Sequence, residues 1–296
     1  MSAISTSSVV ETVPVGTDLA TLSKLARDRH AKYLLQVRIT QFAVVAVLLG
    51  SWEYLSRIGV IDPFFFGSPL GIVERLYEWF RDGTAYGSLW YQIYVTMTEA
   101  FLGFLVGVVA GVVLGVALGE VPFLADVLQP FIKAINALPR IVMGSIFVMW
   151  LGLGLPSKVV LAALLVFFVV FFNAFQGVRG VDRNYVANAR IMGATRLQVV
   201  WHVVIPSAMT WIIASLHVAL GLAVIGAIVG EFLGAQYGLG LVIATAQNTF
   251  DANGVFGAML LIGLLATGAE ALMAIVEKRL LAWRPPASGE SGARGI

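Results

Sequence analysis

Residues 181–206 have the sequence VDRNYVANARIMGATRLQVVWHVVIP, and they separate two long apolar runs. The first part has helix-forming composition, which the residues MGAT at 192–195 interrupt. Glycine readily adopts the left-handed conformation that ends a helix, and threonine is a good N-terminal cap for the next helix. The stretch therefore predicts a polar helical hairpin bent at Gly193. We expect its second helix, residues 195–205, to end at Pro206, where the chain turns back.

The composition on either side of this hairpin is that of a membrane protein. The 296 residues are 59% hydrophobic and 12% charged, whereas soluble domains usually carry about 25% charged residues. A net charge of +2 is too small and too dispersed to indicate nucleic-acid binding. The absence of cysteine excludes disulfides and thiolate metal sites, and the three histidines are far apart in the sequence. We expect an all-α integral membrane protein with no catalytic residue, no metal site and no cofactor of its own.

Runs of about 20 apolar residues mark membrane spans. The sequence contains six such runs, at 39–58, 96–118, 124–151, 159–178, 205–230 and 255–275. The third is interrupted by Pro130, Pro139 and charged residues, so only its second half is typical of a membrane segment. These spans predict a transmembrane domain over residues 39–284, with the hairpin, residues 182–206, as a loop of it.

The two ends of the chain are polar. Residues 1–38 are predicted to form an N-terminal tail, with a short amphipathic helix over residues 19–35 lying on the membrane surface. Residues 285–296 are predicted to be a flexible C-terminal tail.

The distribution of Lys and Arg sets the orientation of the spans, because cytoplasmic segments carry an excess of both. If the N-terminus is inside, the cytoplasmic segments hold thirteen of these residues and the outer segments hold four, when Lys133 and Arg140 within the broken third span are left out. The bias predicts that both termini and the hairpin face the cytoplasm.

Two further segments predict packing. Residues 68–81 begin with Ser and Pro and carry apolar residues at helical spacing, which predicts a short helix at the outer surface. In the second span, glycine recurs at every fourth position from Gly103 to Gly119. Such a smooth ridge lets another helix approach closely, but the sequence does not decide whether that helix belongs to the same chain.

Several polar or flexible residues are candidates for a solute pathway. Prolines inside a span break backbone hydrogen bonds, which is tolerated beside protein or a water-filled cavity; simple kinking explains them equally well. The candidate pathway residues are Asn136, Arg140, Met143, Ser145, Met149 and Glu231. The phenylalanines at 167–175 of the fourth span are explained either by lipid-facing or core packing, or by an apolar gate.

Glu231 has two interpretations. An ionisable group at membrane depth commonly faces a cavity and marks a pathway. The alternative, which we favour, is that Glu231 pairs with Arg140 or a backbone amide and holds the Gly-rich stretch 231–254 as a re-entrant segment.

The hairpin sequence ANARIMGATRLQVVWHVVIP resembles the EAA loop of binding-protein-dependent ABC importer permeases, in which Glu-Ala-Ala precedes a Gly and a closing aliphatic-Pro pair. The matching positions are Ala189, Gly193 with Ala194, and Ile205 with Pro206, while Ala187 and Asn188 replace the first two residues of the triplet. In that family the loop is the coupling helix that sits in a groove of the ATP-hydrolysing subunit. The resemblance implies that the coupling residues are Ala187, Ala189, Arg190, Gly193, Ala194, Thr195, Ile205 and Pro206.

The resemblance extends over residues 39–284. The segments GSPLGIVERL, LPRIVMGSIFVMWLGLGLPSK and GEFLGAQYGLG are similar to the subfamily that imports nitrate, sulfonates such as taurine, bicarbonate, thiamine precursors and aromatic carboxylates. It implies a six-helix permease of the type I kind in the bacterial inner membrane, moving a small, anionic solute by alternating access. The implied partners are a second permease copy, two ATPases that carry ATP and Mg, a periplasmic or lipid-anchored binding protein and membrane lipid.

Two other classes of protein predict features that this chain lacks. A secondary transporter is expected to carry several membrane-embedded charges for ion coupling and ideally an internal repeat. A membrane enzyme is expected to gather His, Asp, Glu or Cys within its spans. The chain also has no G-x-x-x-x-G-K-[ST] phosphate loop, so ATP hydrolysis is expected on a separate subunit.

Overall fold

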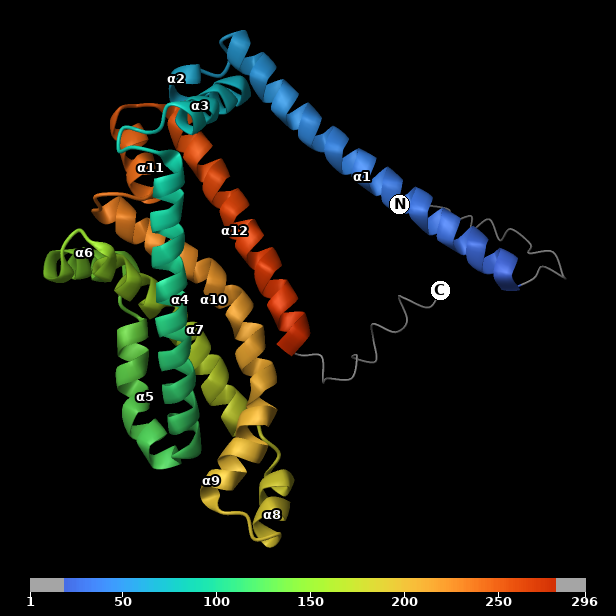
Figure 1. Ribbon diagram of the computed structural model, residues 1–296, viewed down its shortest axis with the longest axis vertical. Coiled ribbons are helices and arrows are strands. Elements are labelled where there is room, and N and C mark those ends of the chain that lie inside the picture. The colour runs from blue at the N-terminus through green and yellow to red at the C-terminus, as the bar shows by residue number, and fades with distance from the viewer. Residues whose placement is uncertain (1–18, 281–296) are drawn as a thin grey trace, which may run out of the picture. The chain divides into compact units, whose positions relative to one another are not determined.

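The computed structural model describes residues 19–280, and in that range the regular structure is helical apart from a single bridge between Thr84 and Gly87. Chain contacts divide the protein into two units, residues 1–54 with 285–296 and residues 55–284. The helices, labelled in Figure 1, are α1 Leu19–Arg57, α2 Pro63–Phe66, α3 Pro69–Arg81, α4 Leu89–Glu120, α5 Pro122–Asn136, α6 Arg140–Leu151, α7 Leu155–Arg179, α8 Arg183–Ile191, α9 Arg196–Val199, the π-helix η1 Val200–Val204, α10 Ile205–Leu233, α11 Leu239–Asn248 and α12 Ala252–Leu280.

Five of these helices are long and apolar enough to cross a membrane, and the number rises to six if the bent pair α5 and α6 is one span. The first of the five is residues 32–57 of α1. The predicted separate surface helix at 19–35 is wrong, because α1 continues without a break from Leu19 to Arg57. Residues 1–18 of the predicted N-terminal tail and the whole predicted C-terminal tail, residues 285–296, lie outside the described residues.

The third predicted span is a broken one. Its two halves, α5 and α6, meet at an angle of 87°, which is visible in Figure 1. The break falls at residues 137–139, in front of α6, whereas Pro130 lies inside α5 without ending it. The second half alone does not cross a membrane, because α6 has 12 residues, about 18 Å of helix, against a hydrocarbon core of about 30 Å.

The core of the larger unit is the packing of α4 against α7. Five glycines of α4, Gly103, Gly107, Gly111, Gly115 and Gly119, face α7. A Cβ added at Gly107 would stand 2.6 Å from the carbonyl oxygen of Ala163 and 2.7 Å from Cβ of Val166. The ridge predicted from the sequence therefore packs within the chain, and its partner is α7.

The helix that follows the hairpin corrects one prediction. Pro206 does not turn the chain, because α9, η1 and α10 form one helical run from Arg196 to Leu233. Proline has no amide hydrogen and clashes with the carbonyl four residues earlier in an ordinary helix. The wider π-turn of η1, in which the N–H of Ile205 donates to the carbonyl of Val200, accommodates the ring without breaking the helix.

Candidate functional site

The hairpin has the local structure that its sequence predicts. Asp182 caps α8 by accepting a hydrogen bond from the Asn184 amide at 2.9 Å. Gly193 has φ +87°, in the left-handed region that favours glycine. Thr195 begins α9 in a capping box, in which its side chain accepts from the Gln198 amide and the Gln198 side chain accepts from the Thr195 amide. We call this α8–Gly193–α9 unit the elbow.

The elbow has an apolar tip exposed to solvent. Ile191 and Met192 are 84% and 87% exposed, and Leu197 is 68% exposed. These side chains lie on either side of Gly193, so the tip of the elbow is apolar. Figure 1 shows the elbow at the end of the larger unit opposite α3.

The base of the elbow packs on the membrane helices. Val199 and Val204 are buried against Ala174 and Val178 of α7, so the elbow is anchored to the bundle core. Of the predicted coupling residues, Ala189 and Ala194 contact this cluster and Ile205 is partly buried. The others are exposed: Ala187, Arg190, Gly193, Thr195 and Pro206. Their contact with an ATPase stays a prediction.

Glu231 is fully buried and holds α11 in place. Its carboxylate accepts a hydrogen bond from Thr96 Oγ1 at 2.7 Å and one from the Gly240 amide at 2.6 Å. The glycines of the Gly238-Leu239-Gly240 turn allow this close approach, since a Cβ on either would collide with the Glu231 side chain. The structure thus supplies the backbone-amide pairing predicted for Glu231. Arg140, the other predicted partner, instead donates to Asn136 Oδ1 at 3.4 Å.

Two buried charges beside Glu231 were not singled out from the sequence. Lys158 is 0% exposed, and its Nζ donates to the carbonyls of Leu153 and Gly154. Glu99 is 3% exposed, and its Oε2 makes no hydrogen bond within the described part of the chain. The sequence did contain a signal for Glu99, because it is a charged residue at the edge of an otherwise uncharged span.

The remaining candidate pathway residues lie on α5 and α6. Asn136 ends α5 and Arg140 begins α6, on either side of the bend. Asn136 and Met143 are partly buried. The exposed ones are Arg140, Ser145 and Met149. Glu231 hydrogen-bonds to Thr96 and Gly240 and not to any of these residues, and their role in a pathway stays a prediction.

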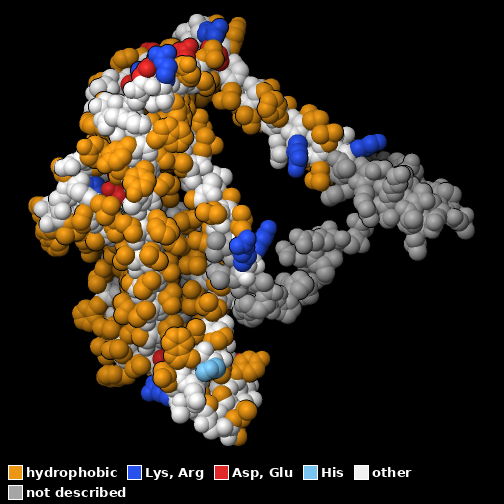
Figure 2. Space-filling view, viewed as in Figure 1, with side chains coloured by type: hydrophobic (Ala, Val, Ile, Leu, Met, Phe, Trp, Pro, Cys, Tyr) orange, Lys and Arg blue, Asp and Glu red, His pale blue; other side chains and the backbone are white. Residues whose placement is uncertain are grey.

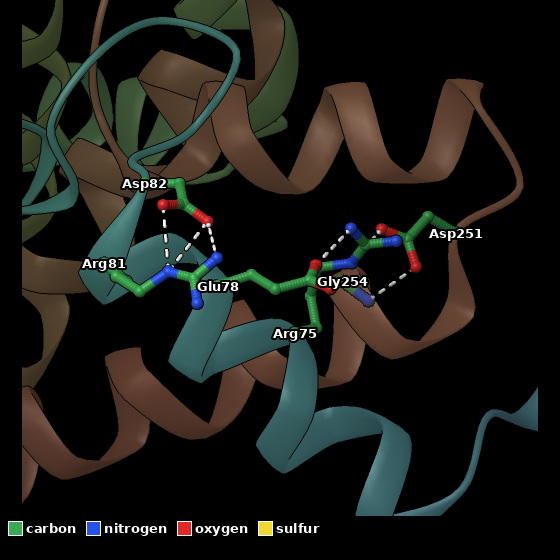
Figure 3. Close-up of polar contacts among 6 residues, drawn as sticks. All are labelled: Arg75, Glu78, Arg81, Asp82, Asp251 and Gly254. Carbon is green, nitrogen blue, oxygen red and sulfur yellow. Dashed lines mark hydrogen bonds and ion pairs between the residues drawn. The ribbon is translucent and has the colours of Figure 1, made fainter.

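Ion pairs organise the end of the larger unit that is remote from the elbow (Figure 3). Arg75 of α3 pairs with Glu78 at 2.8 Å and with Asp251, in front of α12, at 3.0 Å, while Asp251 caps α12 by accepting from the Gly254 amide at 2.9 Å. These residues and the α11 face border an open cavity of about 630 Å³.

The second pair in Figure 3 joins Arg81 Nη2 and Asp82 Oδ2 at 2.8 Å. The hydrogen bond from Arg81 holds the pKa of the Asp82 carboxyl below its usual value.

Between its two ends, the larger unit presents mostly hydrophobic side chains. Figure 2 shows this on the face that carries α4 and α5, with the charged side chains gathered largely toward the ends. In residues 19–280, no group of three or more His, Cys, Asp or Glu side chains is arranged to hold a metal ion. Apolar helices of spanning length with a protruding elbow define a multi-pass membrane protein.

Comparisons with known proteins identify the family. The family model described as "Binding-protein-dependent transport system inner membrane component" matches residues 107–282. The aliphatic sulfonates transport permease protein SsuC of Bacillus subtilis is 29% identical, with 81% of this chain and 85% of SsuC covered. The riboflavin permease RibX of Chloroflexus aurantiacus is 32% identical, with 80% and 87% covered. The taurine permease TauC of Escherichia coli is 28% identical, with 81% and 87% covered.

The fold agrees with this family. An inward-facing structure of the MetNI methionine ABC transporter superimposes with a TM-score of 0.51 at 20% identity, covering 66% of this chain and 93% of that one. The chain belongs to the binding-protein-dependent inner-membrane transport components. It is a permease subunit of an ABC importer. Such a subunit works with ATPase and substrate-binding partners, and a secondary transporter is not favoured.

Proposed function

We propose that two copies of this chain form the membrane part of the importer, in the bacterial inner membrane with both termini in the cytoplasm. Each elbow sits in a groove of one of two ATPase subunits, which bind ATP and Mg, whereas the permease itself binds no cofactor. The single observation that carries this proposal is the elbow itself, with its exposed apolar tip and its rigid base. One elbow per chain and two ATPases per importer favour a homodimer.

The helix behind the elbow supports a mechanism of alternating access. The 38 residues from Arg196 to Leu233 make a helical path of about 57 Å. Its far end carries Glu231, which ties α10 to α4 and α11. Movement of the elbow by the ATPases is thereby transmitted along one helix to the opposite end of the unit. ATP biases the inward and outward states through its different contacts with each.

The substrate that we propose is a small organic or inorganic anion of the sulfonate, nitrate, bicarbonate or aromatic carboxylate type. Two relatives named for aliphatic sulfonates and taurine, itself a sulfonate, support this choice. A periplasmic or lipid-anchored binding protein delivers the solute to the outer end, where the ion-paired cavity beside α3 and α11 offers a polar docking surface. The five charges on its border suit a partner with charges of both signs.

A single-cysteine experiment tests the proposed arrangement, because the natural chain has no cysteine. Met192→Cys places a thiol on the elbow tip and Tyr77→Cys places a matched thiol on α3, at 87% and 63% exposed positions. In the assembled complex, a short bifunctional maleimide–amine reagent is expected to link residue 192, and not residue 77, to the ATPase. A membrane-impermeant maleimide is expected to label residue 77 from outside intact cells and residue 192 only after lysis.

Transport by the reconstituted complex provides the second arm. Liposomes that contain the permease and its ATPase are expected to accumulate labelled ethanesulfonate only with ATP inside the cytoplasmic compartment and binding protein on the other side. Labelling of residue 192 from outside, or uptake that follows an ion gradient without ATP, contradicts the proposal.

A further inference from the structure

A small cavity lies between α4, α5 and α7, close to the elbow end of these helices. Its volume is about 240 Å³. The lining residues are Leu118, Ala125, Gln129, Ile132, Lys133, Phe171, Phe172, Phe175 and Gln176. None of them is among the pathway residues predicted from the sequence. The three phenylalanines belong to the group at 167–175, for which the sequence left both packing and an apolar gate as explanations.

One wall of this cavity is aromatic. The rings of Phe171 and Phe172 meet edge to face with centroids 5.2 Å apart, and Phe171 stacks on Phe175 at 6.0 Å with 17° between the planes. Phe171 is buried, whereas Phe172 and Phe175 keep partly exposed surface. Aromatic edges and faces of this kind hold a planar apolar group in a defined orientation.

The rest of the lining carries a cation and two amides. Gln129 and Lys133 are four residues apart and so share one face of α5, and Gln176 projects from α7. Within residues 19–280, the side chain of Lys133 makes no ion pair or hydrogen bond, although its backbone carbonyl accepts from the Ala137 amide. Lys133 is the one charged residue among the described residues that line the cavity, while Arg179 nearby pairs with Asp126 at 3.8 Å and lies over the Phe175 ring at 4.9 Å. The cavity therefore has a net positive charge.

The polar face of α5 continues from the cavity to the bend. Asn136 follows Gln129 by seven residues and Lys133 by three, on the same side of the helix. Arg140 begins α6 and donates to Asn136 Oδ1. Two cations and two amides thus line one side of α5 and the bend, and ionisable groups at membrane depth usually face a solute path.

We propose that this cavity is a substrate subsite for a small organic anion with a planar apolar body, such as an aromatic sulfonate or carboxylate. Lys133 contacts the anionic group, Gln129 and Gln176 donate hydrogen bonds to it, and the Phe172 and Phe175 rings contact the body. The volume of 240 Å³ equals about eight waters at ~30 Å³ each, which matches a solute of about ten non-hydrogen atoms. An inorganic anion would leave the aromatic wall unused, and a lipid chain would leave Lys133 unpaired. The inference rests on the proposed function.

Binding to the permease–ATPase complex in lipid nanodiscs tests the subsite. The probes are labelled benzenesulfonate, ethanesulfonate with the same charge but no ring, and benzyl alcohol with a ring but no charge. Lys133→Gln is expected to weaken binding of both sulfonates at least tenfold, whereas Lys133→Arg keeps it within threefold. Phe172→Leu is expected to weaken benzenesulfonate binding about fivefold and to leave ethanesulfonate unchanged, because a lost aromatic contact costs about 1 kcal/mol.

The control is Lys278→Gln, which removes one exposed charge from α12, away from the cavity lining, and is expected to bind all three probes as the natural chain does. Unchanged sulfonate binding by Lys133→Gln, or benzyl alcohol binding as tight as benzenesulfonate, overturns the subsite. If Lys133→Gln does not assemble with the ATPase, the other two variants test the subsite. Lys133→Arg must then keep sulfonate binding within threefold, and Phe172→Leu must weaken benzenesulfonate binding without changing ethanesulfonate binding. If these binding tests fail but the complex still shows ATP-driven uptake, only the subsite is refuted and the proposed function stands. If the complex of the natural chain shows no ATP-driven uptake, the proposed function is refuted, whatever the complex binds.

Discussion

Replacing Gly193 by alanine isolates the conformation of the elbow from its contacts. Gly193 has φ +87°, and a Cβ added there would meet nothing within 4 Å. The substitution therefore causes no clash with a neighbour, and its cost comes from the backbone alone. An L-residue in the left-handed region costs about 1–2 kcal/mol, and 1.4 kcal/mol corresponds to a factor of ten.

We expect Gly193→Ala to lower the population of the bent elbow by about tenfold. ATP-driven uptake and stimulation of the ATPase by binding protein should fall together, each by a factor of about three to ten, because both need the elbow in its groove. Asparagine visits the left-handed region more readily than alanine, so Gly193→Asn should give an intermediate loss. Uptake of labelled ethanesulfonate, ATP hydrolysis and co-purification of the ATPase are the measurements.

Gly180 provides the matched control at the start of the same hairpin. It ends α7 with φ −81° and ψ −1°, which any residue adopts, and an added Cβ would lie 3.2 Å from the Gln176 carbonyl oxygen. This contact is relieved by a shift of a few tenths of an ångström, so Gly180→Ala should change uptake less than twofold. Equal losses in Gly180→Ala and Gly193→Ala would show that the positive φ at residue 193 has no special part in coupling, and the reasoning from the elbow would be refuted.

Two predictions concern stability, measured as thermal unfolding of the purified permease. Glu231→Gln removes the acceptor for the Gly240 amide or Thr96 and should destabilise by about 1–3 kcal/mol; Glu270→Gln, on the exposed side of α12, should have little effect, and equal effects would contradict the bracing role. Gly111→Leu should destabilise by about 3 kcal/mol or more through overpacking, since a Cβ alone would lie 2.9 Å from Cβ of Val170. Gly268→Leu, with nothing within 4 Å, is its control, and similar unfolding temperatures would refute close packing of α4 on α7.

Features that depend on neighbouring residues could be predicted from the sequence. The elbow is an example, because Gly193 and the Thr195–Gln198 capping box act within a few positions of the chain. The helix at residues 68–81 is another, with Ser68 as its cap and Pro69 in its first turn. The apolar runs were recognisable for the same reason, since a membrane demands about 20 consecutive apolar residues whatever lies beside them.

Local signals were less informative where two effects compete. Pro206 predicted a turn, but the π-turn of η1 absorbs the proline and the helix continues. Pro130 and Pro139 both predicted breaks, and only the residues in front of α6 break the helix. Which of these outcomes occurs depends on the packing around each proline, and the sequence near it does not contain that information.

By itself, the sequence determined that this chain is a helical membrane protein with one polar hairpin and a glycine ridge, because each of these features depends on residues that are close together in the sequence. Only the tertiary structure decided that the ridge packs on α7, that Glu231 binds Thr96 across 135 positions of sequence, and that Lys133 lines a cavity together with three phenylalanines from another helix. Contacts between residues so far apart depend on how whole helices pack, and no local pattern specifies that packing.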